Sequence, residues 1–336
     1  MELNRTKPFR LRLLAFSGVL ALGTLLLPEA AESRNPQIHS VKQSGPVQER
    51  INLVFLAEGY TEGEDQAFVE DARELAAYLF HRQPFEEYEA FFNVFAIPVV
   101  SQESGTDDPS QGIEKDTYFN SSFDSWGLPQ GLTIPPNNFD PDPVNGFGKA
   151  RTLLDELFPE WDLIIILVND GHYGGWGDYR GIVTSTHGFS GEVLTHEMGH
   201  AFAGLGDEYT DPFPQDPEPV REEPNTTQET RRDQIKWKVW IEEDTPVPTP
   251  EVGFSDRVGL FEGARYNQTG WFRPKLRCKM SANWVPFCEV CREALILAIY
   301  RQKDGIATVS PVSDRIEPVG ASMTELSLET LRPSPE

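Results

Sequence analysis

Residues 190–209, SGEVLTHEMGHAFAGLGDEY, decide how the chain is interpreted. His196 and His200 are four residues apart, so on a helix both imidazoles leave from one face and can bind one tetrahedral metal ion. Glu197 follows the first histidine, where a carboxylate can accept a proton from water activated by the metal. The stretch therefore predicts a zinc-binding helix. The core behind it is predicted by the helix's apolar residues, which are Val193, Leu194, Met198, Ala201 and Phe202.

The residues after this helix predict a third metal ligand. Gly204 is expected to end the helix and Gly206 to allow a tight turn, so that the chain returns to the metal just downstream. Asp207 is our choice of third ligand because carboxylate oxygen binds zinc, and Glu208 is the competing candidate. The alternative is that His196 and His200 are core histidines without a metal. We expect zinc because buried histidines need partners, which a metal supplies.

Composition and charge exclude several functional classes. The 336 residues include 29 Lys and Arg against 53 Asp and Glu, which gives a formal net charge of −24. So acidic a chain is not expected to bind nucleic acid through a basic face. With 39% hydrophobic and 24% charged residues, the composition is that of a soluble folded protein. We expect a monomer.

The first 31 residues have the pattern of a signal peptide. An apolar run at residues 13–27 follows a basic start, and residues 28–31 offer small side chains to a signal peptidase. The run is short for a membrane span, although an uncleaved N-terminal anchor is the alternative. We therefore expect a secreted or periplasmic protein without stable membrane association after cleavage.

Hydrophobic periodicity predicts an α/β (α+β) fold. Residues 161–168 are almost continuously apolar, as is typical of a strand buried on both faces, so a mixed twisted sheet with helices on both faces is expected. The helix that carries His196 is expected to begin at Gly191, with Ser190 as its N-cap. Other strands are predicted at 51–56, 92–100 and 180–185, and other helices at 61–80, 149–158 and 289–300.

Three irregular segments are expected to form loops. Residues 101–148 are rich in Ser, Asp, Asn, Gly and Pro, and a loop this long usually lies near a site. Residues 169–177 form a glycine- and aromatic-rich loop before the strand at 180–185, whose exposed edge is a candidate for pairing with an extended substrate. Residues 211–250 are acidic and proline-rich, but their tryptophans predict a loop packed onto the body rather than a linker.

The three cysteines, Cys278, Cys288 and Cys291, leave two interpretations open. The last two form a CxxC pair, which is compatible with a structural zinc site, although the sequence shows no fourth ligand. One disulfide and one free thiol is the other interpretation for an exported chain. His172 and His187 could line a cleft, but each alone is more typical of a hydrogen-bonded loop histidine.

The sequence resembles the IgA peptidase family, the sixty-fourth metallopeptidase family, whose members are secreted, metzincin-like zinc endopeptidases. The motif His-Glu-x-Gly-His at 196–200 and Gly-Leu-x-Asp-Glu-Tyr at 204–209 carry the resemblance. It extends over about residues 50–300 through further matches: VFLAEGY at 54–60, ESGTD at 103–107, YGG at 173–175, GLFEG at 259–263 and CKM at 278–280.

The resemblance implies a smaller C-terminal lobe in which Met280 belongs to a Met-turn, the apolar floor under the metal of metzincins. The chain also departs from the metzincin pattern. Ala203 and Gly206 stand where metzincins have a glycine and their third ligand, while Gly204 and Asp207 come one residue later. Ala282 occupies the place of an oxyanion-stabilising tyrosine, and Tyr209 and Tyr266 are weaker candidates for that role.

These features together predict a secreted zinc endopeptidase in which a metal-activated water, with Glu197 as general base, hydrolyses protein or peptide substrates. The alternatives are a zinc hydrolase of cell-wall peptides or non-peptide amides, and a non-catalytic zinc-stabilised extracellular binding module. The predicted organisation is a signal peptide (1–31), an N-terminal linker (32–49), a metallopeptidase catalytic domain (50–301) and a C-terminal tail (302–336).

Overall fold

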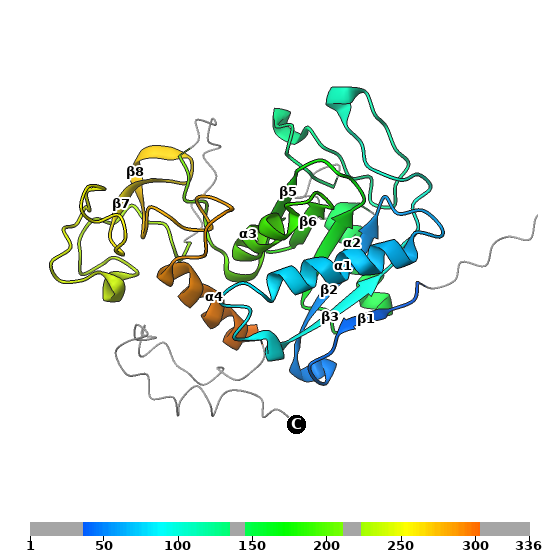
Figure 1. Ribbon diagram of the computed structural model, residues 1–336, viewed down its shortest axis with the longest axis horizontal. Helices are drawn as coiled ribbons and strands as arrows, with labels where there is room; N and C mark the ends of the chain where they lie inside the picture. Colours follow the sequence, from blue (N-terminus) through cyan, green and yellow to red (C-terminus); the bar gives the residue numbers. More distant parts are fainter. Residues whose placement is uncertain (1–35, 135–144, 211–222, 303–336) are drawn as a thin grey trace, which may run out of the picture. The chain divides into compact units, whose positions relative to one another are not determined.

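The computed structural model of the protein describes residues 36–134, 145–210 and 223–302, and a six-stranded mixed sheet lies at its centre (Figure 1). The four inner strands run parallel to one another, and the two edge strands, β1 and β5, are antiparallel to their neighbours. This architecture agrees with the expected α/β (α+β) fold. In spatial order the strands are β1 (His39–Lys42), β3 (Phe92–Ile97), β2 (Ile51–Glu58), β4 (Leu163–Val168), β6 (Gly181–Ser185) and β5 (Gly175–Asp178).

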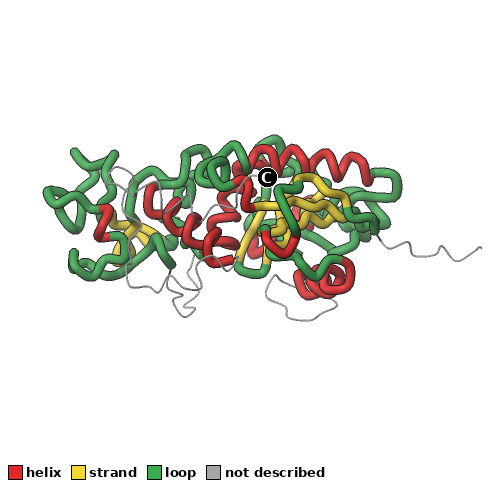
Figure 2. The backbone as a smooth tube through the Cα atoms, turned by 90° about the horizontal axis from the view of Figure 1, so that it is seen from below, coloured by secondary structure: helices red, strands yellow, loops and turns green. Residues whose placement is uncertain are grey.

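The inner strands are buried along their whole length. Strands without alternation need cover on both faces, and Figure 2 shows helices on both sides of the sheet. A Cβ atom at Gly175 would lie 2.4 Å from Val193 of α3 (Ser190–Ala203), and one at Gly181 would lie 2.4 Å from Phe147 of α2 (Gly146–Leu157). Gly175 pairs with Thr184, so these two glycines face opposite sides of the sheet. The expectation of helices on both faces is thus confirmed.

Two further helices pack against α3, and one of them also covers the sheet. Helix α1 (Asp65–Leu79) packs on β1, β3 and α3, and α4 (Glu289–Gln302) packs on α3. The buried residues of α1 recur at helical spacing, as predicted for 61–80. They are Phe68, Val69, Ala72, Leu75, Ala76 and Leu79.

Several local predictions need correction. Ser190 is the first residue of α3 and not its N-cap, because its hydroxyl donates to the carbonyl of His187 and accepts no helix amide. The predicted loop 169–177 contains most of β5. Residues 32–49, assigned to a linker, contain β1, which pairs with β3. These short strands are stabilised by pairing and carry little apolar pattern of their own.

A second, two-stranded sheet was not predicted. Strand β7 (Phe261–Ala264) pairs antiparallel with β8 (Asn267–Arg273) across a two-residue turn. The turn residues Arg265 and Tyr266 have positive φ angles of 49° and 65°, the left-handed conformation that tight hairpins require. Because this conformation is unfavourable for residues other than glycine, the surrounding contacts must hold it.

The described part of the acidic, proline-rich segment packs on the body as predicted. Trp237 is 1% exposed and Ile241 7% exposed, and the Trp237 indole N–H donates to the carbonyl of Gly259 at 2.8 Å. The predicted signal peptide (1–31), most of the tail (302–336) and parts of the loops 101–148 and 211–250 lie outside the described residues. Within the described ranges, no helix has the length and apolarity needed to cross a membrane.

Candidate metal centre

Helix α3 presents His196 and His200 on one face and ends where the sequence predicts. Gly204 adopts a left-handed conformation with φ of 66°, and the N–H groups of Gly204 and Leu205 donate to the carbonyls of His200 and Gly199. This is the usual way for a helix to end at a glycine. The chain then turns through Gly206, so the residues that follow return to the side of the helix that carries the histidines.

The structure brings together the three predicted ligands. Asp207 Oδ1 lies 3.2 Å from His196 Nε2 and 3.2 Å from His200 Nε2, and the two Nε2 atoms are 3.1 Å apart. His196 and Asp207 are 7% and 9% exposed, and the His200 side chain is 17% exposed. Two nitrogens and one carboxylate oxygen that converge in this way form a candidate site for a metal ion.

Main-chain contacts fix which nitrogen of each imidazole faces this point. His196 Nδ1 lies 2.9 Å from the carbonyl of Lys279, and His200 Nδ1 lies 2.7 Å from the carbonyl of Leu205. A carbonyl accepts only, so each Nδ1 must carry the hydrogen, and each neutral ring then turns an Nε2 lone pair toward Asp207. Three electron-pair donors at about 3 Å repel one another unless a cation lies between them. The donor set therefore fits a metal ion.

The Asp207 carboxylate also changes the pKa of His200 when no metal is bound. Burial lowers the pKa of His200, but the Asp207 carboxylate more than offsets this and raises it to about 10. Without a metal, a proton therefore takes the cation's place between the side chains, and metal and proton compete for this position.

Glu197 lies beside the ligands and lines a cavity. The cavity has a volume of about 270 Å³, and its lining includes Tyr173, His196, Glu197, Tyr209 and Asn283. Burial raises the pKa of Glu197, although the charges of His196 and His200 oppose this shift. A carboxylate with a raised pKa next to a metal-ligand histidine is suited to accept a proton from water and to return it.

Strand β5 holds Glu197 from the opposite side. The backbone amide of Gly177 opposes the rise in the pKa of Glu197. A Cβ atom at Gly177 would lie 2.9 Å from Glu197 Cβ and 3.1 Å from the Glu197 main-chain oxygen. Position 177 therefore leaves no room for a side chain unless the strand and the helix move apart.

Tyr266 supports Asp207 from the β7–β8 turn. Its hydroxyl donates to Asp207 Oδ2, the oxygen turned away from the histidines. The N–H groups of Arg265 and Tyr266 also donate to the main-chain carbonyls of Asp207 and Tyr209, at 2.8 and 2.9 Å. These contacts hold the unfavourable turn in place. Tyr266 is only a weak candidate for oxyanion stabilisation from the sequence, and the structure directs its hydroxyl to Asp207 instead.

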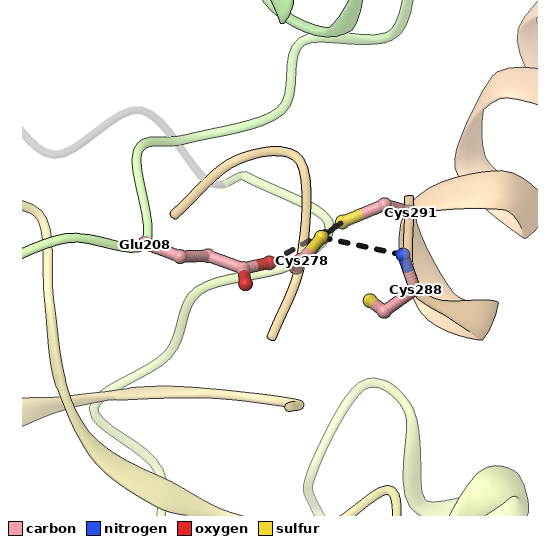
Figure 3. A group of neighbouring side chains, drawn as sticks. All are labelled: Glu208, Cys278, Cys288 and Cys291. Carbon is pink, nitrogen blue, oxygen red and sulfur yellow. Dashed lines mark hydrogen bonds between the residues drawn. The ribbon is translucent and has the colours of Figure 1, made fainter. Parts of the chain in front are cut away.

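Glu208, the competing ligand, points to a different place. It is fully buried, and Figure 3 shows its carboxylate directed at Cys278 and Cys291. Asn225, which the sequence analysis missed as a positioning residue, donates to Glu208 Oε1 and bonds both the N–H and the carbonyl of Gly206. The geometry thus favours Asp207 over Glu208 as the third ligand.

The segment around Met280 packs against helix α3, beside the two histidines. Met280 is fully buried, and a Cβ atom at Gly199 would lie 2.6 Å from Met280 Sδ. The N–H of Glu208 donates to the Met280 carbonyl at 2.8 Å. The neighbouring Lys279 is 2% exposed and its ammonium group pairs with Glu192 in the first turn of α3. Lys279 and Met280 therefore contact both the first turn of α3 and Glu208, the residue that follows Asp207.

The two other candidate histidines lie apart from this centre. His172 pairs with Asp170 at 2.7 Å and its side chain is 64% exposed, while the His187 ring contacts the rings of Tyr173 and Phe189. Neither belongs to the lining of the cavity beside Glu197. Both thus fit the interpretation as loop histidines.

Comparison with known families agrees with this geometry. A family model described as IgA peptidase M64 matches residues 39–253 and 251–299, which include every residue of the candidate centre. The chain belongs to the IgA peptidase M64 family. Membership in M64 makes the chain a member of a metallopeptidase family, with proteins or peptides as its class of substrate. No curated protein shows a significant match to this M64 chain.

Proposed function

We propose that this M64 member is an exported zinc endopeptidase in which His196, His200 and Asp207 hold the metal and Glu197 is the general base. The observation that carries the proposal is the convergence of two Nε2 atoms and Asp207 Oδ1 within 3.2 Å, with both Nδ1 atoms committed to carbonyls. Zinc is the metal proposed because two histidines and one carboxylate with an open fourth position are typical of its catalytic sites.

A zinc ion bound there would polarise the scissile carbonyl and lower the pKa of water. The protein's own residues do the rest. Glu197, which lies against Gly177 of β5, accepts the proton of the attacking water and returns it to the leaving amine. Met280, whose sulfur lies against Gly199 of α3, would take the part of the Met-turn methionine under the metal. Tyr209 lines the cavity, and because its hydroxyl makes only a long bond of 3.4 Å to that of Tyr266, it is the remaining candidate for contact with the oxyanion.

The substrate is proposed to bind as an extended strand along β5. This strand pairs with β6 on one side, and in the described part of the chain no strand pairs with its outer edge. Gly175 at its start lines the cavity together with Glu197 and with Ser281, Ala282 and Asn283 from the Met280 segment. A peptide that adds to this edge through main-chain hydrogen bonds would pass directly over the ligands.

The test is hydrolysis of a panel of denatured proteins by wild type and by Glu197→Gln. The variant keeps the shape of the side chain but cannot take a proton, so zinc content should stay at the wild-type level while hydrolysis falls by about three orders of magnitude or more. Glu70→Gln, an exposed position on α1, is the matched control and should behave as wild type. A chelator should abolish hydrolysis and added zinc should restore it.

The other functional classes give different results in this test. Wild-type hydrolysis by Glu197→Gln contradicts the general-base assignment. Zinc binding without cleavage of any protein, but with cleavage of cell-wall peptides or simple amides, identifies a different hydrolase. Zinc binding without any hydrolysis identifies a binding module. Export is tested separately, by sequencing the N-terminus of the protein recovered from outside the cytoplasm, which should begin near Glu32.

A further inference from the structure

All three cysteines of the chain lie together beside Glu208 (Figure 3). Cys278, Cys291 and Glu208 are fully buried, and Cys288 is 4% exposed. One ligand atom from each of the four residues lies within 4.8 Å of the others. Cys278 Sγ is 3.5 Å from Cys291 Sγ, which in turn is 3.3 Å from Glu208 Oε1. Four potential metal ligands thus converge at a place distinct from the histidines of α3.

Glu208 brings an unsatisfied oxygen to this cluster. Its Oε1 accepts from Asn225, but its Oε2 is buried and has no hydrogen-bond partner within the described residues. The nearby guanidinium group of Arg273 donates to the main-chain carbonyls of Glu208 and Gly263 through Nη1. A buried carboxylate oxygen without a partner is unfavourable, and a cation among the sulfur atoms would satisfy it.

The backbone around the cysteines favours thiolates. Cys288 directly precedes α4 and Cys291 lies in its first turn, where the positive end of the helix dipole stabilises negative charge. The N–H of Cys288 donates to Cys278 Sγ, at 3.3 Å. A sulfur atom that accepts a main-chain N–H, next to a CxxC pair, is what a metal-bound thiolate requires.

We infer that Cys278, Cys288, Cys291 and Glu208 bind a second metal ion, a structural zinc with three thiolates and one carboxylate. In a tetrahedral site with Zn–S bonds of about 2.3 Å, sulfur atoms lie about 3.8 Å apart, which is close to the observed separation. The four ligands would close the site, as is usual for structural zinc. This site does not depend on the proposed peptidase function.

A disulfide explains the cluster less completely. A bond between two of the sulfur atoms, about 2.05 Å long, would leave the third thiol buried beside Glu208 and would leave Oε2 without a partner. A metal ion engages all four residues at once. The sequence interpretation of a zinc site lacked a fourth ligand because Glu208 lies 83 positions from Cys291 in the chain.

The second site would tie together three segments, two of which also build the first. Glu208 follows the ligand Asp207, and Cys278 precedes Lys279, whose carbonyl accepts from His196. Cys291 adds helix α4. A metal at the cysteines would therefore fix the backbone on which Asp207 and the His196 contact depend.

The first experiment measures metal content and cobalt spectra on full-length wild type and on His196→Ala/His200→Ala, which lacks the first site and keeps all cysteines. Wild type should contain two zinc ions per chain and the double variant one. After replacement of zinc by cobalt, both should show the same thiolate-to-cobalt charge-transfer band, which histidine and carboxylate ligands cannot produce. One zinc in wild type together with no such band would overturn the inference.

Variants of the cluster provide the second test. Cys288→Ser should abolish the band, and Glu208→Gln should weaken metal retention in a competition with chelator by about tenfold or more. The matched control is Glu58→Gln, since Glu58 is also fully buried but its carboxylate accepts from Thr117, Phe119 and Ser121. It should leave the band unchanged.

Thiol titration separates metal from disulfide even if a cysteine variant fails to fold. Wild type that is unfolded without reductant in the presence of chelator should release three free thiols. A single free thiol per chain would show a disulfide and would overturn the inference.

Discussion

The hydroxyl of Tyr266 donates to Asp207 Oδ2, while the other oxygen of the same carboxylate faces both histidines. One aspartate is thereby oriented by a residue of the β7–β8 turn. Such a partner fixes the carboxylate rotamer and leaves one oxygen free for the metal. The two-stranded sheet, which carries none of the proposed ligands, therefore contributes to the geometry of the centre.

Tyr266→Phe tests this relationship. Loss of the hydroxyl should weaken metal binding at the first site by about ten- to a hundred-fold, because partners of metal ligands typically contribute that much. Zinc affinity is measured by competition with a chelator. Tyr209→Phe is the control, since its hydroxyl donates to that of Tyr266 at 3.4 Å while Tyr266 alone donates to Asp207. Equal affinities for both variants would contradict the supporting role of Tyr266.

Gly177→Ala should impair catalysis without removing the metal. The added methyl group would lie 2.9 Å from Glu197 Cβ, so strand β5 or helix α3 must shift, and kcat/KM should fall on the order of a hundred-fold. Gly188→Ala is the control because a Cβ atom there meets nothing within 4 Å. If zinc content and kcat/KM of Gly177→Ala both equal those of wild type, Gly177 does not position the base.

Asp207→Ala and Glu208→Ala should have separable effects, although the two residues are neighbours. Asp207→Ala should lose hydrolysis and the metal held by the histidines, while the cysteine cluster keeps its ligands. Glu208→Ala should act first on stability, seen as a lower midpoint of thermal unfolding. Metal analysis and thermal scans on both variants test this prediction, and loss of the histidine-bound metal in Glu208→Ala alone would show that Glu208 is the ligand.

The pair of Glu192 and Lys279 predicts a dependence of stability on pH. Burial raises the pKa of Glu192, but hydrogen bonds from Lys279 and Tyr78 and the charges of Lys279 and Arg82 offset this and hold it below its ordinary value of 4.5. Because the folded-state pKa is depressed, the stabilisation is present above about pH 4.5 and is lost as the pH falls through the folded-state value.

Glu192→Gln should therefore lower the free energy of unfolding by about 3 kcal/mol at pH 7, since it leaves the buried Lys279 without its anionic partner. Below the folded-state pKa the wild type loses the same partner, so the difference should shrink. Urea unfolding of metal-free wild type and variant, at pH 7 and at a pH below the folded-state pKa of Glu192, measures this difference. Glu70→Gln, in an exposed pair with Arg73, should change stability little at either pH, and a constant effect of Glu192→Gln would refute the assignment.

Much of the core and of the ligand helix follows from local sequence patterns. The spacing of His196 and His200 requires only a helix, and Gly204 ends that helix as predicted. The inner strands are apolar runs, because burial on both faces leaves no place for polar side chains. Such features depend on neighbours in the sequence and can be predicted from it.

The contacts that orient the site depend instead on distant residues. Tyr266 reaches Asp207 across 59 positions, and the His196 contact with Lys279 spans 83. Strand β5 has no apolar pattern, and its role comes from the close approach of Gly177 to Glu197. The assignment of Asp207 and Glu208 to different clusters also required the fold, since both carboxylates are equally compatible with zinc in the sequence.

The adjacency of Asp207 and Glu208 limits how this part of the chain can vary in length. Asp207 lies with the histidines and Glu208 lies with the cysteines, although a single peptide bond joins the two residues. Removal or insertion of one residue between Gly206 and Tyr209 would bring the wrong side chain to each cluster, and no repacking of side chains could correct both. The length of this segment is therefore as constrained as the identity of its residues.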